Sequence, residues 1–69
     1  MTLQYGAIYI AERKVSKYGI ERGDTFLNDT KLPWKDRSSG EIFYLVYRIN
    51  KGWQAALPKK VLVKMTRVV

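Results

Sequence analysis

The segment from Glu41 to Asn50, EIFYLVYRIN, constrains the fold of this chain more than any other stretch. Apolar side chains recur along it at the period of two that is typical of a β-strand. The apolar side chains at this period lie on one face of the strand and are Phe43, Leu45, Tyr47 and Ile49. The opposite face, from Ile42 to Arg48, is also largely apolar. Because both faces are apolar, we expect this strand to be a central one, with Phe43, Leu45 and Tyr47 in the core.

Four further segments have the β-branched and aromatic composition of strands. They are Leu3–Ala11, Asp24–Asn28, Trp53–Leu57 and Val61–Val68. Asn50-Lys51-Gly52 predicts a tight turn, since Asn and Gly tolerate a positive φ. Pro58 has no N–H to give to a sheet and therefore predicts a bend. The polar stretches 12–23 and 29–40 are predicted to be loops.

This pattern predicts an all-β protein in which residues 1–69 form one domain, a small barrel of five short strands. In the last strand Lys60, Lys64 and Thr66 are expected to face solvent. The apolar residues of the 12–23 loop, which are Val15, Tyr18 and Ile20, are expected to hold that loop on the core. The predicted core consists of Ile8, Ile10, Ile20, Phe26, Phe43, Leu45, Tyr47, Ala55, Leu57, Val61 and Val63.

The order of these segments resembles the SH3 fold over most of the chain. Ala7–Ala11 is similar to the Ala-Leu-Tyr-Asp-Tyr strand of SH3 domains, and Gly19–Phe26 to the hydrophobic-x-x-Gly-Asp turn after their RT loop. Phe43–Arg48 falls where their Trp-Trp strand lies. Ala56–Val63 resembles the segment in which a short 3₁₀ turn joins their last two strands. The resemblance implies an SH3-like barrel with a 3₁₀ turn near Pro58.

The resemblance also implies a groove, in which SH3 domains bind Pro-rich peptides between aromatic side chains and use acidic loop residues to pair a ligand arginine. The matching positions are Tyr9, Pro58 and either Phe43 or Tyr44. Two further groove tyrosines are replaced by Ala11 and Val61, and the 12–23 loop is basic on balance. We therefore do not expect ordinary proline-motif binding.

A second resemblance involves the same motifs in a different order. Leu57–Leu62, LPKKVL, and Gly19–Phe26, GIERGDTF, are also similar to segments of AbrB-type swapped-hairpin transcription factors. In that family the Leu-Pro segment precedes the Gly-Asp element, whereas here it comes after it. The order favours the SH3-like interpretation.

The chain contains neither histidine nor cysteine, which excludes thiol and imidazole catalysis and zinc sites built on those side chains. Its few carboxylates are not spaced as an acid–base pair or a metal site, and no phosphate-cradling glycine loop occurs. We expect no enzyme activity, no metal and no cofactor. No apolar run approaches the roughly 20 residues that span a bilayer, and no signal peptide is evident. A cytoplasmic protein that does not bind membranes is expected.

Basic side chains dominate the charge of the chain, with 13 Lys and Arg against 6 Asp and Glu. Residues 41–69 hold six of the basic side chains and a single acid, Glu41, so this part carries a net charge of 6 − 1 = +5. A basic domain of this size attracts polyanions.

The leading interpretation is a basic module that binds DNA or RNA mainly through phosphates. Archaeal chromatin proteins, integrase tails and ribosomal KOW-type domains are SH3-like barrels that bind nucleic acid with a basic face, so the resemblance allows this function. Trp34 lies among cations and either stacks on bases or caps the core, and Trp53 is expected to pack across its strand pair. The candidate binding residues are Lys14, Lys17, Trp34, Lys35, Arg37, Tyr44, Lys51, Lys59, Lys60, Lys64 and Arg67.

The alternative interpretation is a protein-interaction module of a phage or mobile-element type, which docks on an acidic host or partner protein. Exposed aromatic side chains beside lysines suit a protein interface as well as they suit nucleic acid. The two interpretations share a charged contact surface and differ in what the aromatic rings meet. The sequence does not decide the oligomeric state.

Overall fold

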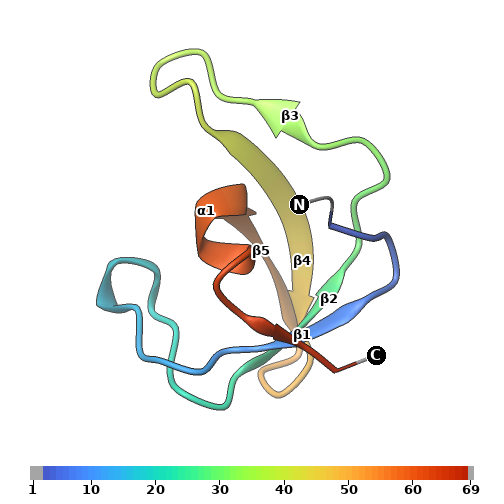
Figure 1. Cartoon of the computed structure of the whole chain (residues 1–69), viewed down its shortest axis with the longest axis vertical. Coiled ribbons are helices and arrows are strands. Elements are labelled where there is room, and N and C mark those ends of the chain that lie inside the picture. Colours follow the sequence, from blue (N-terminus) through green and yellow to red (C-terminus); the bar gives the residue numbers. More distant parts are fainter. Residues whose placement is uncertain (1–2, 69) are drawn as a thin grey trace.

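The computed structural model describes residues 3–68, which form a six-stranded antiparallel sheet with two short helical turns (Figure 1). The strands are β1 (Ile8–Ile10), β2 (Thr25–Asn28), β3 (Trp34–Lys35), β4 (Ile42–Arg48), β5 (Trp53–Pro58) and β6 (Thr66–Arg67). A 3₁₀ turn, η1 (Ser16–Tyr18), lies between β1 and β2, and one helical turn, α1 (Lys59–Leu62), joins β5 to β6. No helix in this part of the chain is long and apolar enough to cross a membrane.

The strands lie in the order β3-β4-β2-β1-β6, and β5 pairs with β4 outside this path. The predicted all-β class is confirmed in that the chain is mostly β, but the number of strands and the closure of the sheet are not as predicted. β3 is an additional strand: it lies within residues 29–40, which were predicted to be a loop, and it pairs with β4. Within residues 3–68, β5 and β6 are not paired with each other, so the sheet stays open and does not close into a barrel.

The face of β4 that points into the core is the opposite of the one predicted. Tyr44 and Val46 are buried, whereas Tyr47 has an exposed fraction of 36%. Val46 lies opposite Asn28 of β2, and Tyr44 lies opposite Leu57 of β5. Because both faces of this strand are apolar, alternation alone does not identify the inner one, and a shift of one residue exchanges them.

Among residues 3–68, eleven buried apolar side chains form the core, namely Leu3, Ala7, Tyr9, Ala11, Ile20, Phe26, Tyr44, Val46, Leu57, Leu62 and Met65. The predicted positions Ile20, Phe26 and Leu57 are confirmed. The other predicted core residues, apart from Tyr47, are half-buried, namely Ile8, Ile10, Phe43, Leu45, Ala55, Val61 and Val63. Val15 and Tyr18 pack against the core, which confirms that the 12–23 loop is held there.

The C-terminal segment Val61–Val68 was predicted to be a strand, and this is wrong for most of its length. Pro58 ends β5, and the chain then makes the helical turn α1, in which the Val63 N–H donates to the Lys59 carbonyl at 2.9 Å. The turn expected near Pro58 is therefore present but is α-helical, and the 3₁₀ turn lies at η1. Leu62 and Met65 are spaced by three residues and are both buried, which favours the helical path over alternation.

The predicted turn at Asn50-Lys51-Gly52 is confirmed, although its geometry differs from the expected one. Of these three turn residues, only Gly52 has a positive φ, at 78°. The N–H groups of Lys51 and Gly52 both donate to the Arg48 carbonyl, at 3.1 and 2.7 Å. Asn50 contributes through its side chain, whose Oδ1 accepts the Thr25 N–H at 3.1 Å. The hairpin is thereby tied to β2 as well as to its own strands.

Candidate binding groove

An ion pair between Asp24 and Arg48 connects the 12–23 loop to the inner face of β4. Arg48 Nη2 lies 2.5 Å from Asp24 Oδ2, and both side chains are almost fully buried. The same nitrogen donates to the Gly19 carbonyl at 3.0 Å, next to η1. The guanidinium lies 5.5 Å from the ring centre of Phe26 and 4.7 Å from that of Trp53. One buried side chain of the sheet thus holds the tip of the loop.

Asp24 accepts two further hydrogen bonds besides the one from Arg48. The Glu21 N–H donates to Oδ2 at 2.9 Å, and Asn50 Nδ2 donates to Oδ1 at 2.7 Å. Burial acts to raise the pKa of Asp24, but the hydrogen bonds from Glu21, Asn50 and Arg48 and the charge of Arg48 outweigh it, so the pKa lies below its ordinary value. Asp24 thus bonds the backbone of the turn beside it and also forms the buried ion pair with Arg48.

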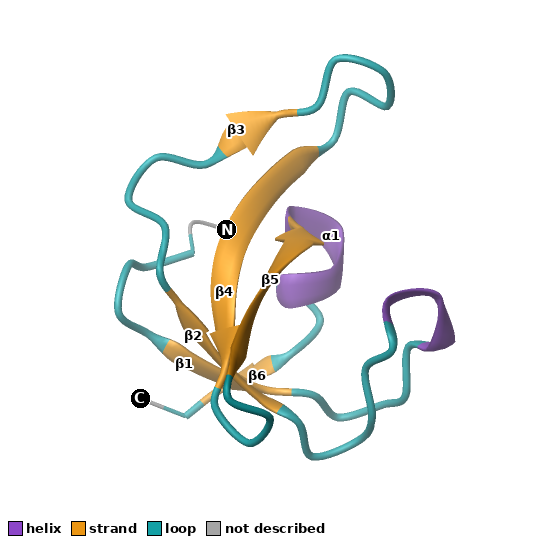
Figure 2. Cartoon of the chain, turned by 180° about the vertical axis from the view of Figure 1, so that it is seen from behind, coloured by secondary structure: helices purple, strands orange, loops and turns teal. Residues whose placement is uncertain are grey.

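The base of the 12–23 loop is closed by backbone hydrogen bonds. The Ala11 N–H donates to the Asp24 carbonyl at 2.9 Å, and the Gly23 N–H donates to the Ala11 carbonyl at 2.8 Å. Farther along, Val15 and Ile20 form an antiparallel bridge. The loop therefore folds as a narrow double-stranded finger, and η1 is its tip (Figure 2).

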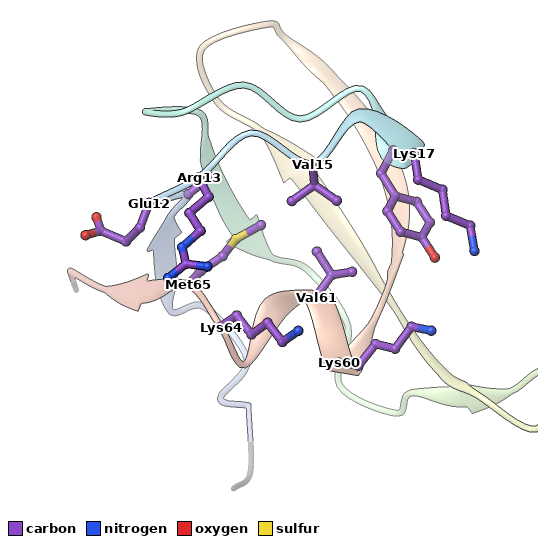
Figure 3. A pocket seen from close by; sticks show the side chains of 10 residues that line it. Glu12, Arg13, Val15, Lys17, Lys60, Val61, Lys64 and Met65 are labelled. Carbon is purple, nitrogen blue, oxygen red and sulfur yellow. The ribbon is translucent and has the colours of Figure 1, made fainter.

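A groove of about 820 Å³ separates this finger from α1 (Figure 3). Its lining comprises Ala11, Glu12, Arg13, Val15, Lys17, Tyr18, Lys60, Val61, Lys64 and Met65. Its apolar members are buried or half-buried and its charged members are exposed, so the apolar ones form the floor. Val15 on the loop and Val61 on α1 point toward each other (Figure 3). Ala11 and Val61 stand at the positions where the SH3 resemblance places tyrosines.

Four cations stand around the apolar floor of the groove: Arg13, Lys17, Lys60 and Lys64. Arg13 and Lys17 come from the loop, whereas Lys60 and Lys64 come from α1 and the residues after it (Figure 3). Lys17 Nζ also lies 5.6 Å from the ring centre of Tyr18. Glu12 is the single acid among the lining residues, so the groove carries a net positive charge and attracts anions.

A second pocket of about 420 Å³ lies beside α1 and is lined by Glu41, Ile42, Pro58, Lys59, Lys60 and Val63. Lys60 lines both this pocket and the groove. Its Nζ lies 2.5 Å from Glu41 Oε1, and the hydrogen bond and charge of Glu41 raise the pKa of Lys60. The one acid of residues 41–69 therefore pairs with a cation that was predicted to contact a ligand.

The candidate binding residues are spread over several parts of the molecule. Lys17, Lys60 and Lys64 line the groove, and Lys59 lines the second pocket. Lys14 is exposed on the loop without lining the groove, and Arg67 is exposed on β6. Trp34, Lys35 and Arg37 lie on β3 and the residues immediately after it, whereas Lys51 lies in the β4–β5 turn. β3 and that turn are far apart in the molecule (Figure 1).

The two aromatic candidate binding residues, Tyr44 and Trp34, differ in their exposure to solvent. Tyr44 has an exposed fraction of 5% and belongs to the core, so no face of its ring is open to a ligand. Tyr9, which the resemblance placed in the groove, is also buried. Trp34 is 44% exposed, and its ring stacks on Phe43 with 6.2 Å between ring centres and 21° between planes. Trp34 therefore does not cap the core.

Several residues of the site were absent from the set predicted from sequence. Arg13 and Tyr18 belong to the groove, and Glu41 pairs with Lys60. Arg13 lies in the same basic run as Lys14, and charge alone does not say which of two neighbours faces α1. Glu41 could have been singled out from the sequence, since it is the one acid among residues 41–69, which are otherwise basic. Within residues 3–68 the acidic side chains form no group that could hold a metal ion.

A scan against protein-family models found no match for this chain, and neither did searches of curated proteins and of solved structures.

Proposed function

We propose that this chain is a non-enzymatic binding module whose groove takes an acidic, partly apolar segment of a partner protein. The observation that carries the proposal is the combination of an apolar floor with a rim of four cations. In an extended segment, successive side chains point to opposite sides. Apolar side chains of such a segment can enter the floor while its carboxylates meet the rim, where charge complementarity favours the correct partner.

The arrangement of the cations supports this proposal over a general phosphate-binding surface. A phosphate-led interface needs cations that track one continuous backbone. Here the predicted cations are divided among the groove, β3 with the loop after it, and the β4–β5 turn. The floor of the groove is largely aliphatic, whereas bases stack on flat aromatic rings. An aliphatic floor suits the side chains of a peptide.

We also infer that the architecture is an open relative of the SH3-like fold. Three features support this: the long loop between β1 and β2, the hairpin at residues 50–52, and the helical turn between β5 and β6. These stand in the order that the resemblance implies. The groove lies between the loop and that helical turn, and its basic rim suits an acidic ligand instead of the basic ligands of SH3 domains.

The test uses three labelled peptides of equal length, in which Glu alternates with Leu, Gln with Leu, or Glu with Ser. Fluorescence anisotropy gives the Kd of each for the purified protein. The Glu–Leu peptide should bind most tightly, because it alone offers both carboxylates and apolar side chains. Lys64→Gln should weaken it by about two- to five-fold. Lys51→Gln, which removes the same charge from the distant β4–β5 turn, should have a smaller effect.

Two results would overturn the proposal. One is that none of the peptides binds at low salt, and the other is that all three bind equally. Equal effects of Lys64→Gln and Lys51→Gln would point to unspecific attraction by net charge, and would also count against a site in the groove.

Nucleic-acid binding is a second candidate because of one observation, the exposed stack of Trp34 on Phe43. Lys35 and Arg37 come shortly after Trp34 in the chain, so two cations accompany this stacking surface in the sequence. A labelled single-stranded oligonucleotide tests it. If this surface binds bases, Trp34→Ala should reduce binding by ~1–3 kcal/mol. Binding that is unaffected by Trp34→Ala, or absent at low salt, would exclude this candidate.

A further inference from the structure

We propose that the carboxylate of Glu41 occupies the position of a ligand carboxylate, and that the second pocket is a further subsite for the same acidic segment. This inference rests on the proposed function of the groove. It assigns to the ligand a pattern in which one acidic side chain is flanked by two apolar ones. The acidic side chain replaces Glu41 at Lys60, while the apolar ones enter the groove and the second pocket.

Lys60 lies between the two hollows. Its side chain belongs to the lining of both, so a segment that crosses directly from one to the other runs along this side chain. In the groove Lys60 stands beside Val61, and in the second pocket it stands beside Pro58 and Val63. A cation between two apolar surfaces is complementary to an anion between two apolar side chains.

The Glu41–Lys60 pair is open to competition from a ligand. The side chain of Lys60 is 62% exposed and that of Glu41 is 26% exposed, and the two are held 2.5 Å apart. Exposed ion pairs are weak, because water and salt compete with them. A ligand carboxylate can therefore replace Glu41 without the cost of opening a buried pair. Within residues 3–68, Lys60 is the one side chain that forms an ion pair with the Glu41 carboxylate.

The experiment compares two variants that change the net charge equally. Glu41→Gln removes the competing carboxylate. Glu21→Gln removes a carboxylate from an exposed position that lines neither hollow. With the Glu–Leu peptide as probe, Glu41→Gln should tighten binding by roughly two- to five-fold, the scale expected for an exposed pair. Glu21→Gln should give a smaller gain, because salt screens distant charges. In a Lys60→Gln background the difference between the two variants should disappear.

A matched pair of valines tests the second pocket. Val61→Thr changes the groove and Val63→Thr changes the second pocket, and both residues are half-buried and flank Leu62. Two Glu–Leu peptides are used, a short one and one long enough to pass Lys60. Val61→Thr should weaken both peptides alike. Val63→Thr should weaken the longer peptide more than the shorter one.

The outcomes separate this inference from the proposed function. If the Glu–Leu peptide does not bind the unmodified protein, the proposed function fails. If the peptide binds but Glu41→Gln and Glu21→Gln have equal effects, the role of Glu41 is refuted while the groove stands. If Val63→Thr weakens both peptides to the same extent, the second pocket is not a subsite.

Discussion

Removal of the Asp24 carboxylate should destabilise this protein more than any change on its surface. In Asp24→Ala the guanidinium of Arg48 remains buried without its counter-ion, and the hydrogen bonds from Asn50 and the Glu21 N–H are also lost. Breaking a buried ion pair on one side typically costs ~3–5 kcal/mol. At roughly 0.05–0.15 kcal/mol per residue, a chain of 69 residues has a total stability of about 3–10 kcal/mol. The variant should therefore be close to unfolding at room temperature.

Urea unfolding, monitored by far-UV circular dichroism, measures this loss directly. Asp29→Ala is the control, since Asp29 is exposed and accepts one side-chain hydrogen bond, from Gln54 at 3.2 Å. It should change the free energy of unfolding by less than about 0.5 kcal/mol. The double variant Asp24→Ala/Arg48→Met should be more stable than Asp24→Ala alone, because it leaves no unpaired charge between the rings of Phe26 and Trp53. A loss below about 1 kcal/mol in Asp24→Ala, or no recovery in the double variant, would refute this reasoning.

The remaining predictions concern acid stability, the core and one turn. Because the pKa of Asp24 is lowered from 3.8, its stabilisation is complete above that pH and is lost as the pH falls through the lower pKa of the folded state. As the pH is lowered, the urea midpoint of Asp24→Asn should therefore fall less steeply than that of the unmodified protein. Equal slopes of the two midpoints against pH would contradict this. In thermal melts, Leu57→Ala should cost ~2–5 kcal/mol of stability, and Leu45→Ala should cost clearly less because Leu45 is half-buried. A larger loss in Leu45→Ala than in Leu57→Ala would support the inner face of β4 that was predicted from sequence. Gly52→Ala should cost ~1–2 kcal/mol of stability because φ is 78° there, whereas the neighbouring Lys51→Ala should be nearly neutral. Equal melting temperatures of the two variants would show that the turn adopts another backbone conformation at no cost.

The sequence predicts where the strands of this fold lie better than it predicts which way they face. The alternation in β4 locates the strand, but both of its faces are apolar. The inner face is the one that carries Arg48, whose charge is tolerated there because Asp24, from a distant part of the chain, neutralises it. Because Asp24 and Arg48 are 24 residues apart, the local hydrophobic pattern of β4 does not predict their ion pair.

The helical turn α1 shows a second limit. Its four residues are too few to display a helical period, and Val61, Leu62 and Val63 also fit a strand by composition. Pro58 marked the bend correctly, since it cannot continue a sheet. Leu62 on α1 and Met65 after it are both buried, and two residues three positions apart cannot lie on the same face of one strand.

The candidate site was predictable in its charge and less so in its shape. The excess of basic residues predicted Lys17, Lys60 and Lys64, which the fold brings to one groove. The same excess also predicted Lys35 and Lys51, which the fold places elsewhere. The groove positions that the SH3 resemblance implied, Tyr9, Pro58 and Phe43 or Tyr44, do not line this groove. Its two walls lie far apart in the chain, so only the fold shows that they face each other.

The way in which the 12–23 finger is fastened has a consequence for binding thermodynamics. Backbone hydrogen bonds close its base, the Val15–Ile20 bridge spans its middle, and Arg48 holds its tip through the Gly19 carbonyl. This wall of the groove is in place before any ligand arrives, so association does not have to order it. The entropy lost on binding then comes from the partner and from the long side chains at the rim, which leaves more of the contact energy for affinity.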